Sequence, residues 1–316
     1  MPAKVIIPES GGRMAAPDMN MACSYFPHME KAVTHMTYLP PLFLGAHRAK
    51  SFLLIVFLAL HSGQVSANGP DGFVSESPLR RVEYWQLRAE AIDAALQDRA
   101  ALSAVKLVFL GDSITDFWQL SENPWVRGQK FGQDSWRPAF VEGLPENRAL
   151  NMGISGDRTE HVLFRIQPKA EGGRGQLDAP ELNPEFIVLM IGINNTWAQE
   201  DPVVDSVFAG IVSVLDAVHA RKPKARIILQ SLLPTNDAER NRTVVVPVNA
   251  RVKDLAASQP HAGYTVFLDL YPKFTDADGG QNAALFVTDG VHPNDAGYRT
   301  WGASLLPFLR SQRHPY

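Results

Sequence analysis

Five short hydrophobic runs, separated by segments with helical spacing, constrain the fold of this chain more than any other feature. Most of the runs are rich in β-branched and aromatic residues, as in strands that are covered on both faces. The runs are residues 105–110, 148–152, 186–191, 226–230 and 264–268, and the helical patterns are residues 78–102, 159–169, 202–221, 244–258 and 295–311. This alternation predicts an α/β fold with a five-stranded parallel sheet between two layers of helices, a three-layer α/β/α sandwich.

The chemistry of such a sheet is expected at the carboxyl ends of its strands, where doubly wound folds bind their ligands. Four segments are candidates, because three directly follow a predicted strand and the fourth precedes the last helix. They read Gly-Asp-Ser-Ile-Thr at 111–115, Asn-Met-Gly-Ile-Ser-Gly-Asp-Arg-Thr at 151–159, Gly-Ile-Asn-Asn-Thr at 192–196 and Asp-Gly-Val-His-Pro at 289–293. Each segment alone also fits an ordinary turn or helix cap, so the argument depends on the set.

Ser113 is the first candidate for a chemical role. It lies between a predicted strand and a predicted helix, where a side chain is held at the surface beside free N–H groups of the helix. This position suits a nucleophile. Asp112 and Ser113 are equally good N-cap residues, so this segment alone leaves both interpretations open.

Asp289 and His292 form the second candidate group. Their i, i+3 spacing on a tight turn lets the carboxylate reach the Nδ1–H of the imidazole, which leaves Nε2 free to act as a base. A solvated acid in a surface loop is the alternative interpretation. The other histidines that follow residue 67 lack an acid at this spacing; they are His161, His219, His261 and His314.

Gly156 and Asn194 complete the set as possible hydrogen-bond donors. A glycine after a strand can turn its backbone N–H towards a ligand, and a side-chain amide at a strand end can donate to an oxyanion. Both residue types are also common in turns. Ser155 is a rival nucleophile, but Gly156 follows it directly, which does not fit the pattern G-x-S-x-G.

In chain order, these residues resemble the four sequence blocks of the SGNH (GDSL) hydrolases. The match spans about residues 105–310, and it consists of Gly111-Asp112-Ser113, Gly156, Gly192-x-Asn194 and Asp289-x-x-His292. Four runs further resemble the platelet-activating-factor acetylhydrolase catalytic subunits and their bacterial relatives; they are residues 110–113, 156–163, 192–195 and 232–234. The resemblance implies a flavodoxin-like fold. Asn195 is one departure, since many members carry Asp there.

The resemblance implies a serine esterase that cleaves short acyl esters, acetyl esters above all. Ser113 would attack the carbonyl carbon, His292 would carry the proton, and Asp289 would orient His292. The oxyanion hole would consist of the Ser113 N–H, the Gly156 N–H and the Asn194 amide. Asp112 would brace the loop. Apart from the resemblance, Phe117, Trp118 and Trp197 lie close in sequence to the candidate segments, so Trp118 and Trp197, with Asp112, are candidates for substrate contact; aromatic residues at these positions also fit a packed core.

Other functions stay open on the residues alone. The same acyl-enzyme would serve an acyltransferase, and the ester could belong to a polysaccharide, a phospholipid or another small molecule. A non-catalytic binding module would need neither the nucleophile nor the base.

Composition excludes several classes of site and partner. A net charge of −3 argues against nucleic acid as a partner. The single cysteine, Cys23, excludes an internal disulfide framework and a cysteine-based zinc site. The histidines that follow residue 67 show no zinc-binding spacing, and no glycine-rich phosphate loop follows a strand. The sequence therefore predicts a site without metal or cofactor.

The first 67 residues are expected to be removed from the mature protein. The apolar run at 51–60 follows Arg48 and Lys50 and precedes Val-Ser-Ala at 65–67, which is typical of a secretory signal peptide cleaved after Ala67. A buried strand or helix is the alternative. The predicted organisation is an extension with a signal peptide at 1–67, an N-terminal segment and helix at 68–103, and a catalytic domain at 104–316. The mature chain is expected to be secreted or periplasmic, without a membrane span.

Overall fold

The computed structural model describes residues 68–69, 72–78, 84–122, 128–197 and 200–314. These residues belong to a single compact unit, Ser62–Tyr316, which includes the predicted N-terminal segment 68–103. The predicted signal peptide and the extension before it lie outside the described residues and stay a prediction.

Five parallel strands form the sheet at the centre of this unit. In spatial order they are β4 (Ala149–Gly153), β3 (Leu107–Gly111), β5 (Phe186–Met190), β6 (Arg226–Gln230) and β7 (Thr265–Leu268). The chain moves outward from β3 in both directions, which is the flavodoxin-like order. Gly111 at the end of β3 pairs with Gly153 and Met190, so these three strands end level with one another. The predicted fold class and all five predicted strands are confirmed within one or two residues.

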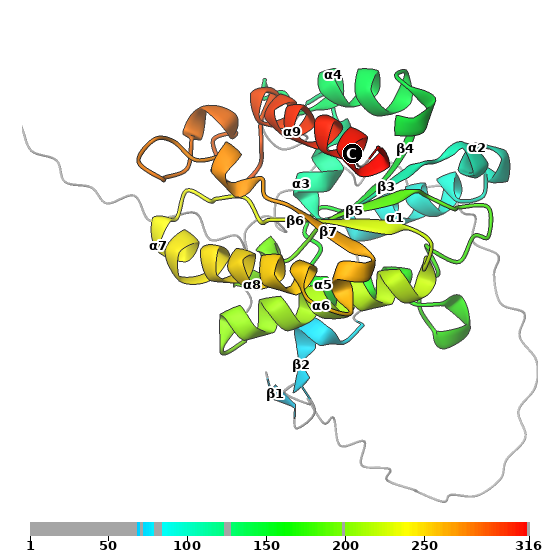
Figure 1. Cartoon of the computed structure of the whole chain (residues 1–316), viewed down its shortest axis with the longest axis horizontal. Helices are drawn as coiled ribbons and strands as arrows, with labels where there is room; N and C mark the ends of the chain where they lie inside the picture. The colour runs from blue at the N-terminus through cyan, green and yellow to red at the C-terminus, as the bar shows by residue number, and fades with distance from the viewer. Residues whose placement is uncertain (1–67, 70–71, 79–83, 123–127, 198–199, 315–316) are drawn as a thin grey trace, which may run out of the picture. The chain divides into compact units, whose positions relative to one another are not determined.

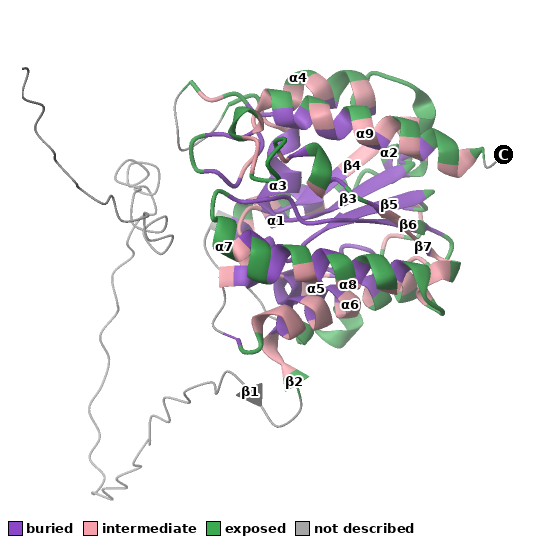
Figure 2. Ribbon diagram, turned by 60° about the vertical axis from the view of Figure 1, so that its left-hand side comes forward, coloured by how far each residue is buried: buried purple, intermediate pink, exposed green. Residues whose placement is uncertain are grey.

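Helices cover both faces of the sheet (Figure 1). One layer contains α5 (Thr159–Ile166), α6 (Val203–Arg221) and α8 (Val246–Ala257), and the opposite layer contains α4 (Gln133–Trp136) and α9 (Asp295–Arg313). The strands between the layers are almost wholly buried, whereas the helices alternate buried and exposed residues (Figure 2). By length and composition α6 could cross a membrane, but its buried residues pack within this layer.

The described residues form four further helices. They are α1 (Tyr84–Ala95), α2 (Arg99–Ala104), α3 (Ser113–Asp116) and α7 (Ala238–Arg240). The single helix expected at 78–102 is therefore divided, because Asp98 accepts a hydrogen bond from the Ala101 N–H and begins α2. Periodicity did not predict α4 and the π-helical turn Arg137–Val141 after it, because together they are too short to show a period. Trp136 and Phe140 from this segment pack edge to face on Phe109 of β3.

The N-terminal segment is attached to α6 by buried polar contacts. β1 (Asn68–Gly69) and β2 (Gly72–Phe73) pair antiparallel, and a 3₁₀ turn (Val74–Glu76) follows. The Ser75 hydroxyl donates to the Ser206 carbonyl at 2.8 Å, and the Val74 N–H donates to Glu200 at 2.6 Å. These contacts bring a segment that precedes the sheet onto the start of α6.

An ion pair with no exposed surface lies beneath the carboxyl ends of β3 and β4. The Nε of Arg165 contacts Oδ2 of Asp157 at 2.8 Å, and both side chains are 0% exposed. Arg165 also donates to the Met152 carbonyl at 2.9 Å, while the Trp85 indole N–H donates to the other Asp157 oxygen at 2.9 Å. Every oxygen of this carboxylate is therefore hydrogen-bonded, which makes its burial tolerable.

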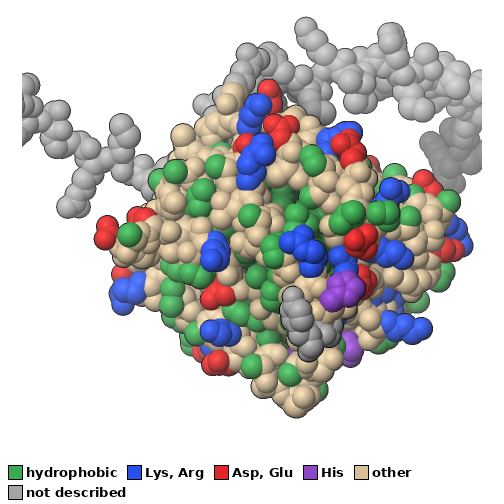
Figure 3. All heavy atoms as spheres, turned by 45° about the horizontal axis from the view of Figure 1, so that its top comes forward, with side chains coloured by type: hydrophobic (Ala, Val, Ile, Leu, Met, Phe, Trp, Pro, Cys, Tyr) green, Lys and Arg blue, Asp and Glu red, His purple; other side chains and the backbone are tan. Residues whose placement is uncertain are grey.

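The surface carries mixed charges on the face shown in Figure 3. Lys and Arg side chains lie beside Asp and Glu side chains across this face and do not gather into one basic patch.

We expect replacement of the buried cation to destabilise the protein strongly. Arg165→Leu leaves the Asp157 carboxylate buried without its cation, so the free energy of unfolding measured by urea denaturation should fall by about 3–5 kcal/mol. Arg137→Leu is the matched control, because it breaks an exposed ion pair with Glu142 and should cost less than about 1 kcal/mol. Equal losses in the two variants would contradict this account of the pair.

Candidate active site

Ser113 stands at the end of the central strand β3. The chain turns at Gly111, where a Cβ would lie 2.3 Å from both the Met190 carbonyl and the Thr115 hydroxyl, so only glycine fits. Asp112 then begins α3 by accepting a hydrogen bond from the Ile114 N–H at 2.9 Å. Ser113 is the first residue of this helix, and it is 4% exposed.

A chain of two short hydrogen bonds joins Ser113 to residues far along the sequence. The Nε2 atom of His292 lies 2.8 Å from the Ser113 Oγ, and the Nδ1 atom lies 2.6 Å from Oδ2 of Asp289. The other Asp289 oxygen accepts the Val291 and His292 N–H groups at 2.8 and 3.0 Å. The imidazole is thus oriented at both nitrogens, with a hydroxyl on one side and a carboxylate on the other.

Two aromatic residues fix the ring and the loops around it. The Phe117 ring lies beside the His292 ring, with centroids 4.9 Å apart. On α9, which begins just after His292, the Tyr298 hydroxyl donates to the Ile114 carbonyl in α3 at 2.8 Å. The helix after the histidine is therefore tied directly to the helix that begins at Ser113. Sequence reasoning missed Tyr298, because nothing in the pattern distinguishes it from other core residues of its helix.

Asp289 stays ionised beside the histidine. Partial burial would raise the pKa of Asp289, but the hydrogen bond and charge of His292 and the two backbone N–H groups outweigh burial and hold the pKa below its usual range. A carboxylate in this position stabilises an imidazolium on its neighbour.

Ser113, Gly156 and Asn194 lie in the segments that follow three neighbouring strands, β3, β4 and β5 respectively. Gly156 has a φ of +78°, a conformation that favours glycine. Asn194 donates one N–H of its amide to the Asp157 carbonyl at 2.8 Å, which fixes the amide beside the Gly156 loop. Among the described residues, no acceptor is paired with the Ser113 N–H, the Gly156 N–H or the second Asn194 N–H.

Asn195, where the family resemblance led us to expect Asp, has a clear local partner. Its Nδ2 donates to the Glu160 carboxylate at 3.0 Å, and its Oδ1 accepts the Thr159 N–H at 3.0 Å. Because Glu160 is buried and already acidic, an amide at 195 avoids a repulsion between two carboxylates. This departure stabilises the start of α5 and leaves Asn194 in place.

Asp112 is buried directly beside Ser113. One of its carboxyl oxygens caps α3, and the other has no hydrogen-bond partner among the described residues. Burial raises the pKa of Asp112 to about 7, against the Ile114 N–H bond, which lowers it, and the charge of Asp157 raises it further. Asp112 therefore braces the loop, and its 1% exposure argues against the expected contact with substrate.

The two tryptophans expected to contact substrate lie in different environments. Trp118 is fully buried and stacks on Trp301 with centroids 4.5 Å apart, so the expectation that it contacts substrate is wrong. It belongs to the aromatic core between the sheet and α9. Trp197 is half-buried three residues after Asn194, and the guanidinium of Arg240 lies 4.5 Å from its ring centroid.

His261 also contacts an acidic side chain, but the two residues lie too far apart in the sequence for their spacing to predict the contact. Nε2 of His261 contacts Asp216 at 3.1 Å, across 45 residues of sequence. The Tyr264 hydroxyl donates to the same oxygen at 2.9 Å, while Nδ1 of His261 has no hydrogen-bond partner among the described residues. Within the described ranges, no cluster of three or more His, Cys, Asp or Glu side chains could hold a metal ion.

Comparisons with known proteins identify similar chains. Residues 109–300 match the model of the GDSL-like lipase/acylhydrolase family. The platelet-activating factor acetylhydrolase IB subunit alpha1 proteins of Bos taurus and Homo sapiens are each 31% identical to this chain over 179 residues, which are 55% of this chain and 62% of each relative. The match thus spans less than two thirds of the length of these relatives.

Solved bacterial structures share the fold. A protein from Bacteroides fragilis assigned as an acylhydrolase has a TM-score of 0.52 and 21% identity, over 73% of this chain and 99% of its own. A GDSL-like lipase from Bacteroides thetaiotaomicron has a TM-score of 0.50 and 23% identity, over 71% of this chain and 99% of its own. At these identities the similarity shows the fold alone.

We expect Asp112 to make the protein less stable as the pH rises. The ordinary pKa of an aspartate is 3.8, and the pKa of Asp112 in the folded protein is about 7. Between pH 3.8 and pH 7, the folded protein therefore holds a proton on Asp112 that the unfolded chain has released. The stabilisation is complete below about pH 3.8 and is lost as the pH rises through 7, at about 1.4 kcal/mol per unit of pKa difference.

Asp112→Asn tests this expectation, because the amide oxygen can still cap α3 but cannot ionise. The melting temperature of the variant minus that of the parent protein should increase from pH 4 to pH 7, because the two pKa values of Asp112, 3.8 and about 7, bound this range. A difference that stays constant over this range would contradict a buried, protonated Asp112.

Proposed function

Since this chain belongs to the GDSL-like lipase/acylhydrolase family, within the SGNH hydrolase superfamily, we propose that it is a serine esterase that hydrolyses carboxylic esters of short acyl groups. One observation carries the proposal: the Ser113 hydroxyl, the His292 imidazole and the Asp289 carboxylate are joined by hydrogen bonds of 2.8 and 2.6 Å. A hydroxyl alone is a weak nucleophile, and this arrangement supplies both the base and the group that orients it.

In the first half of the reaction, Ser113 attacks the ester carbonyl carbon. Nε2 of His292 takes the hydroxyl proton as the new C–O bond forms, and Asp289 stabilises the resulting imidazolium. The tetrahedral intermediate then collapses. The imidazolium gives its proton to the leaving alcohol, and the acyl group stays on Ser113.

In the second half, water replaces the alcohol. His292 takes a proton from the water, the hydroxide attacks the acyl carbon, and the proton returns to Ser113 as the acid leaves. The carbonyl oxygen becomes negatively charged in both halves. We propose that three donors stabilise it: the Ser113 N–H, the Gly156 N–H and the second N–H of Asn194, for which the described residues offer no acceptor. Such fixed donors act on charge that develops only in the transition state.

Acetyl is the acyl group that we propose. The similar mammalian proteins are called acetylhydrolases, which supports a small acyl group without identifying the alcohol.

Removal of the nucleophile should abolish turnover. We expect Ser113→Ala to reduce p-nitrophenyl acetate hydrolysis by at least about 10⁴-fold while the circular dichroism spectrum stays unchanged, because the attacking oxygen is lost. Ser155→Ala is the matched control for the rival serine and should keep its turnover. If the second variant is inactive and the first is active, the assignment of the nucleophile is wrong.

Removal of the amide donor should affect the chemical step more than substrate binding. We expect Asn194→Ala to lower kcat by about 10²–10³-fold with little change in KM, because its N–H is needed most in the transition state. Asn183→Ala is the control, since that amide donates to the Pro180 carbonyl in a surface loop. A raised KM at unchanged kcat would contradict a role in the oxyanion hole.

A further inference from the structure

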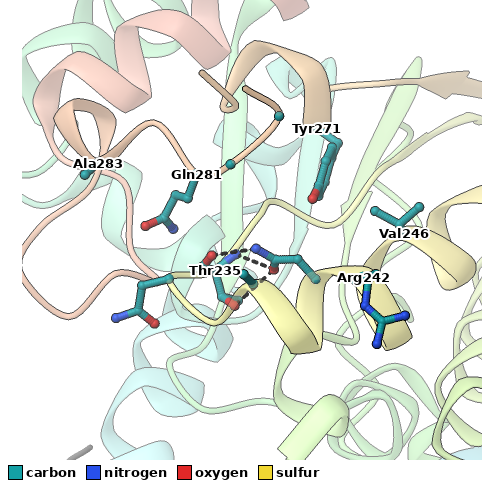
Figure 4. A pocket seen from close by; sticks show the side chains of 11 residues that line it. Thr235, Arg242, Val246, Tyr271, Gln281 and Ala283 are labelled. Atoms are coloured by element: carbon teal, nitrogen blue, oxygen red, sulfur yellow. Dashed lines mark hydrogen bonds between the residues drawn. The ribbon is translucent and has the colours of Figure 1, made fainter. Parts of the chain in front are cut away.

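A pocket of about 480 Å³ lies behind the loop that carries Asp289 and His292. Its walls come from the segment after β6 and from the segment between β7 and α9, which bring Thr235, Val246, Tyr271 and Gln281 together (Figure 4). Neither Ser113 nor His292 lines it, so it is separate from the site described above. Its volume is within the range of small-molecule sites, about 300–1,000 Å³.

Hydrogen bonds fix the residues Thr235, Asn241 and Gln281 that line the pocket. The side chain of Asn241 donates to the Thr235 carbonyl at 2.7 Å and accepts the Thr235 N–H at 2.8 Å. The Gln281 amide donates to the Pro234 and Gly290 carbonyls at 2.8 and 2.7 Å. A site with polar groups held in this way is formed before a ligand arrives, which lowers the cost of binding.

The pocket offers hydrogen bonds but no free charge. Both N–H groups of Gln281 are used, so its oxygen remains as an acceptor, and the Tyr271 hydroxyl has no partner among the described residues. Burial raises the pKa of Tyr271, so the hydroxyl keeps its proton and can donate. Arg242 is the only charged side chain of the lining, and it already binds Glu239 through contacts of 2.6 and 2.9 Å.

The same walls also present apolar surface. The Tyr271 ring faces the space from one side and the exposed side chain of Val246 lies nearby, as Figure 4 shows. Ala238 and Ala283 add small apolar patches at the rim. A ligand with hydroxyl groups around its edge and an apolar face would satisfy both kinds of surface, whereas an ion would find no free counter-charge.

We propose that this pocket binds a neutral sugar ring as a second site of the protein. The ring hydroxyls donate to the Gln281 oxygen and accept from Tyr271, and the apolar face packs on the Tyr271 ring and Val246. Gln281 also holds the Gly290 carbonyl, next to Asp289, and Asn236 donates its backbone N–H to the same carbonyl at 3.0 Å. A bound sugar therefore stabilises the loop that carries Asp289 and His292.

Binding is tested on the full chain with Ser113→Ala, so the result does not depend on hydrolysis. The probes are cellobiose, xylobiose and chitobiose, titrated separately by calorimetry. At least one should bind with a millimolar or lower Kd. Tyr271→Phe in the same background should weaken binding by about fivefold, as expected for the loss of one hydrogen bond. Tyr264→Phe is the matched control, because that hydroxyl is bonded to Asp216 outside the pocket, and it should leave the Kd unchanged.

Two further measurements locate the site and guard against misfolding. Val246→Trp places a large side chain at an exposed rim position and should abolish binding without lowering the melting temperature. Addition of the bound disaccharide should slow amide hydrogen exchange in residues 287–294. The proposal is overturned if none of the three disaccharides binds, if binding is insensitive to both pocket variants, or if slowed hydrogen exchange appears only outside residues 287–294.

Discussion

The arrangement of the whole catalytic edge depends on one buried ion pair, that between Arg165 and Asp157. Two charges with no exposed surface are costly unless every polar atom is satisfied, and here the contacts that satisfy them also connect the elements. Arg165 holds the Met152 carbonyl at the end of β4, and Trp85 brings α1 to the same carboxylate. The Asp157 carbonyl then receives the Asn194 amide. The loops after β4 and β5 are thereby fixed relative to each other.

The parallel sheet brings the other functional residues to the same edge. Parallel strands that end level with one another deliver Ser113, Gly156 and Asn194 to one edge, because β4, β3 and β5 are neighbours. The histidine arrives from a loop that no strand directly precedes. Its position depends on α9, where Tyr298 reaches back to α3, and on Phe117, which packs against the imidazole. Chemistry at this edge thus depends on both layers of helices.

The order of the elements and the location of the reactive residues could be predicted from the sequence. Buried strands and amphipathic helices have short periods that a single chain displays, so the order of elements and the edge with the reactive residues were predicted. No comparable pattern in the sequence shows whether an individual aromatic residue is buried. Trp118 lies two positions past α3 and looks equally suited to a pocket wall, yet tertiary packing with Trp301 places it in the core.

Polar partners that lie far apart in the sequence could not be predicted from it either. Arg165 stands between Phe164 and Ile166 in α5, but nothing in the local sequence identifies Asp157 as its partner. The Gln281 pocket could not be predicted either. Its lining comes from segments 235–246 and 271–283, which β7 separates in the sequence and which meet beside the neighbouring strands β6 and β7.

The central claim is that Ser113 is the residue that becomes acylated. Intact-protein mass spectrometry after treatment with a fluorophosphonate, followed by peptide mapping, tests this most directly. The account predicts one adduct per chain, located on Ser113, and no adduct when His292 is replaced by alanine. An adduct on Ser155, or a chain that stays unlabelled while it hydrolyses esters, would contradict it.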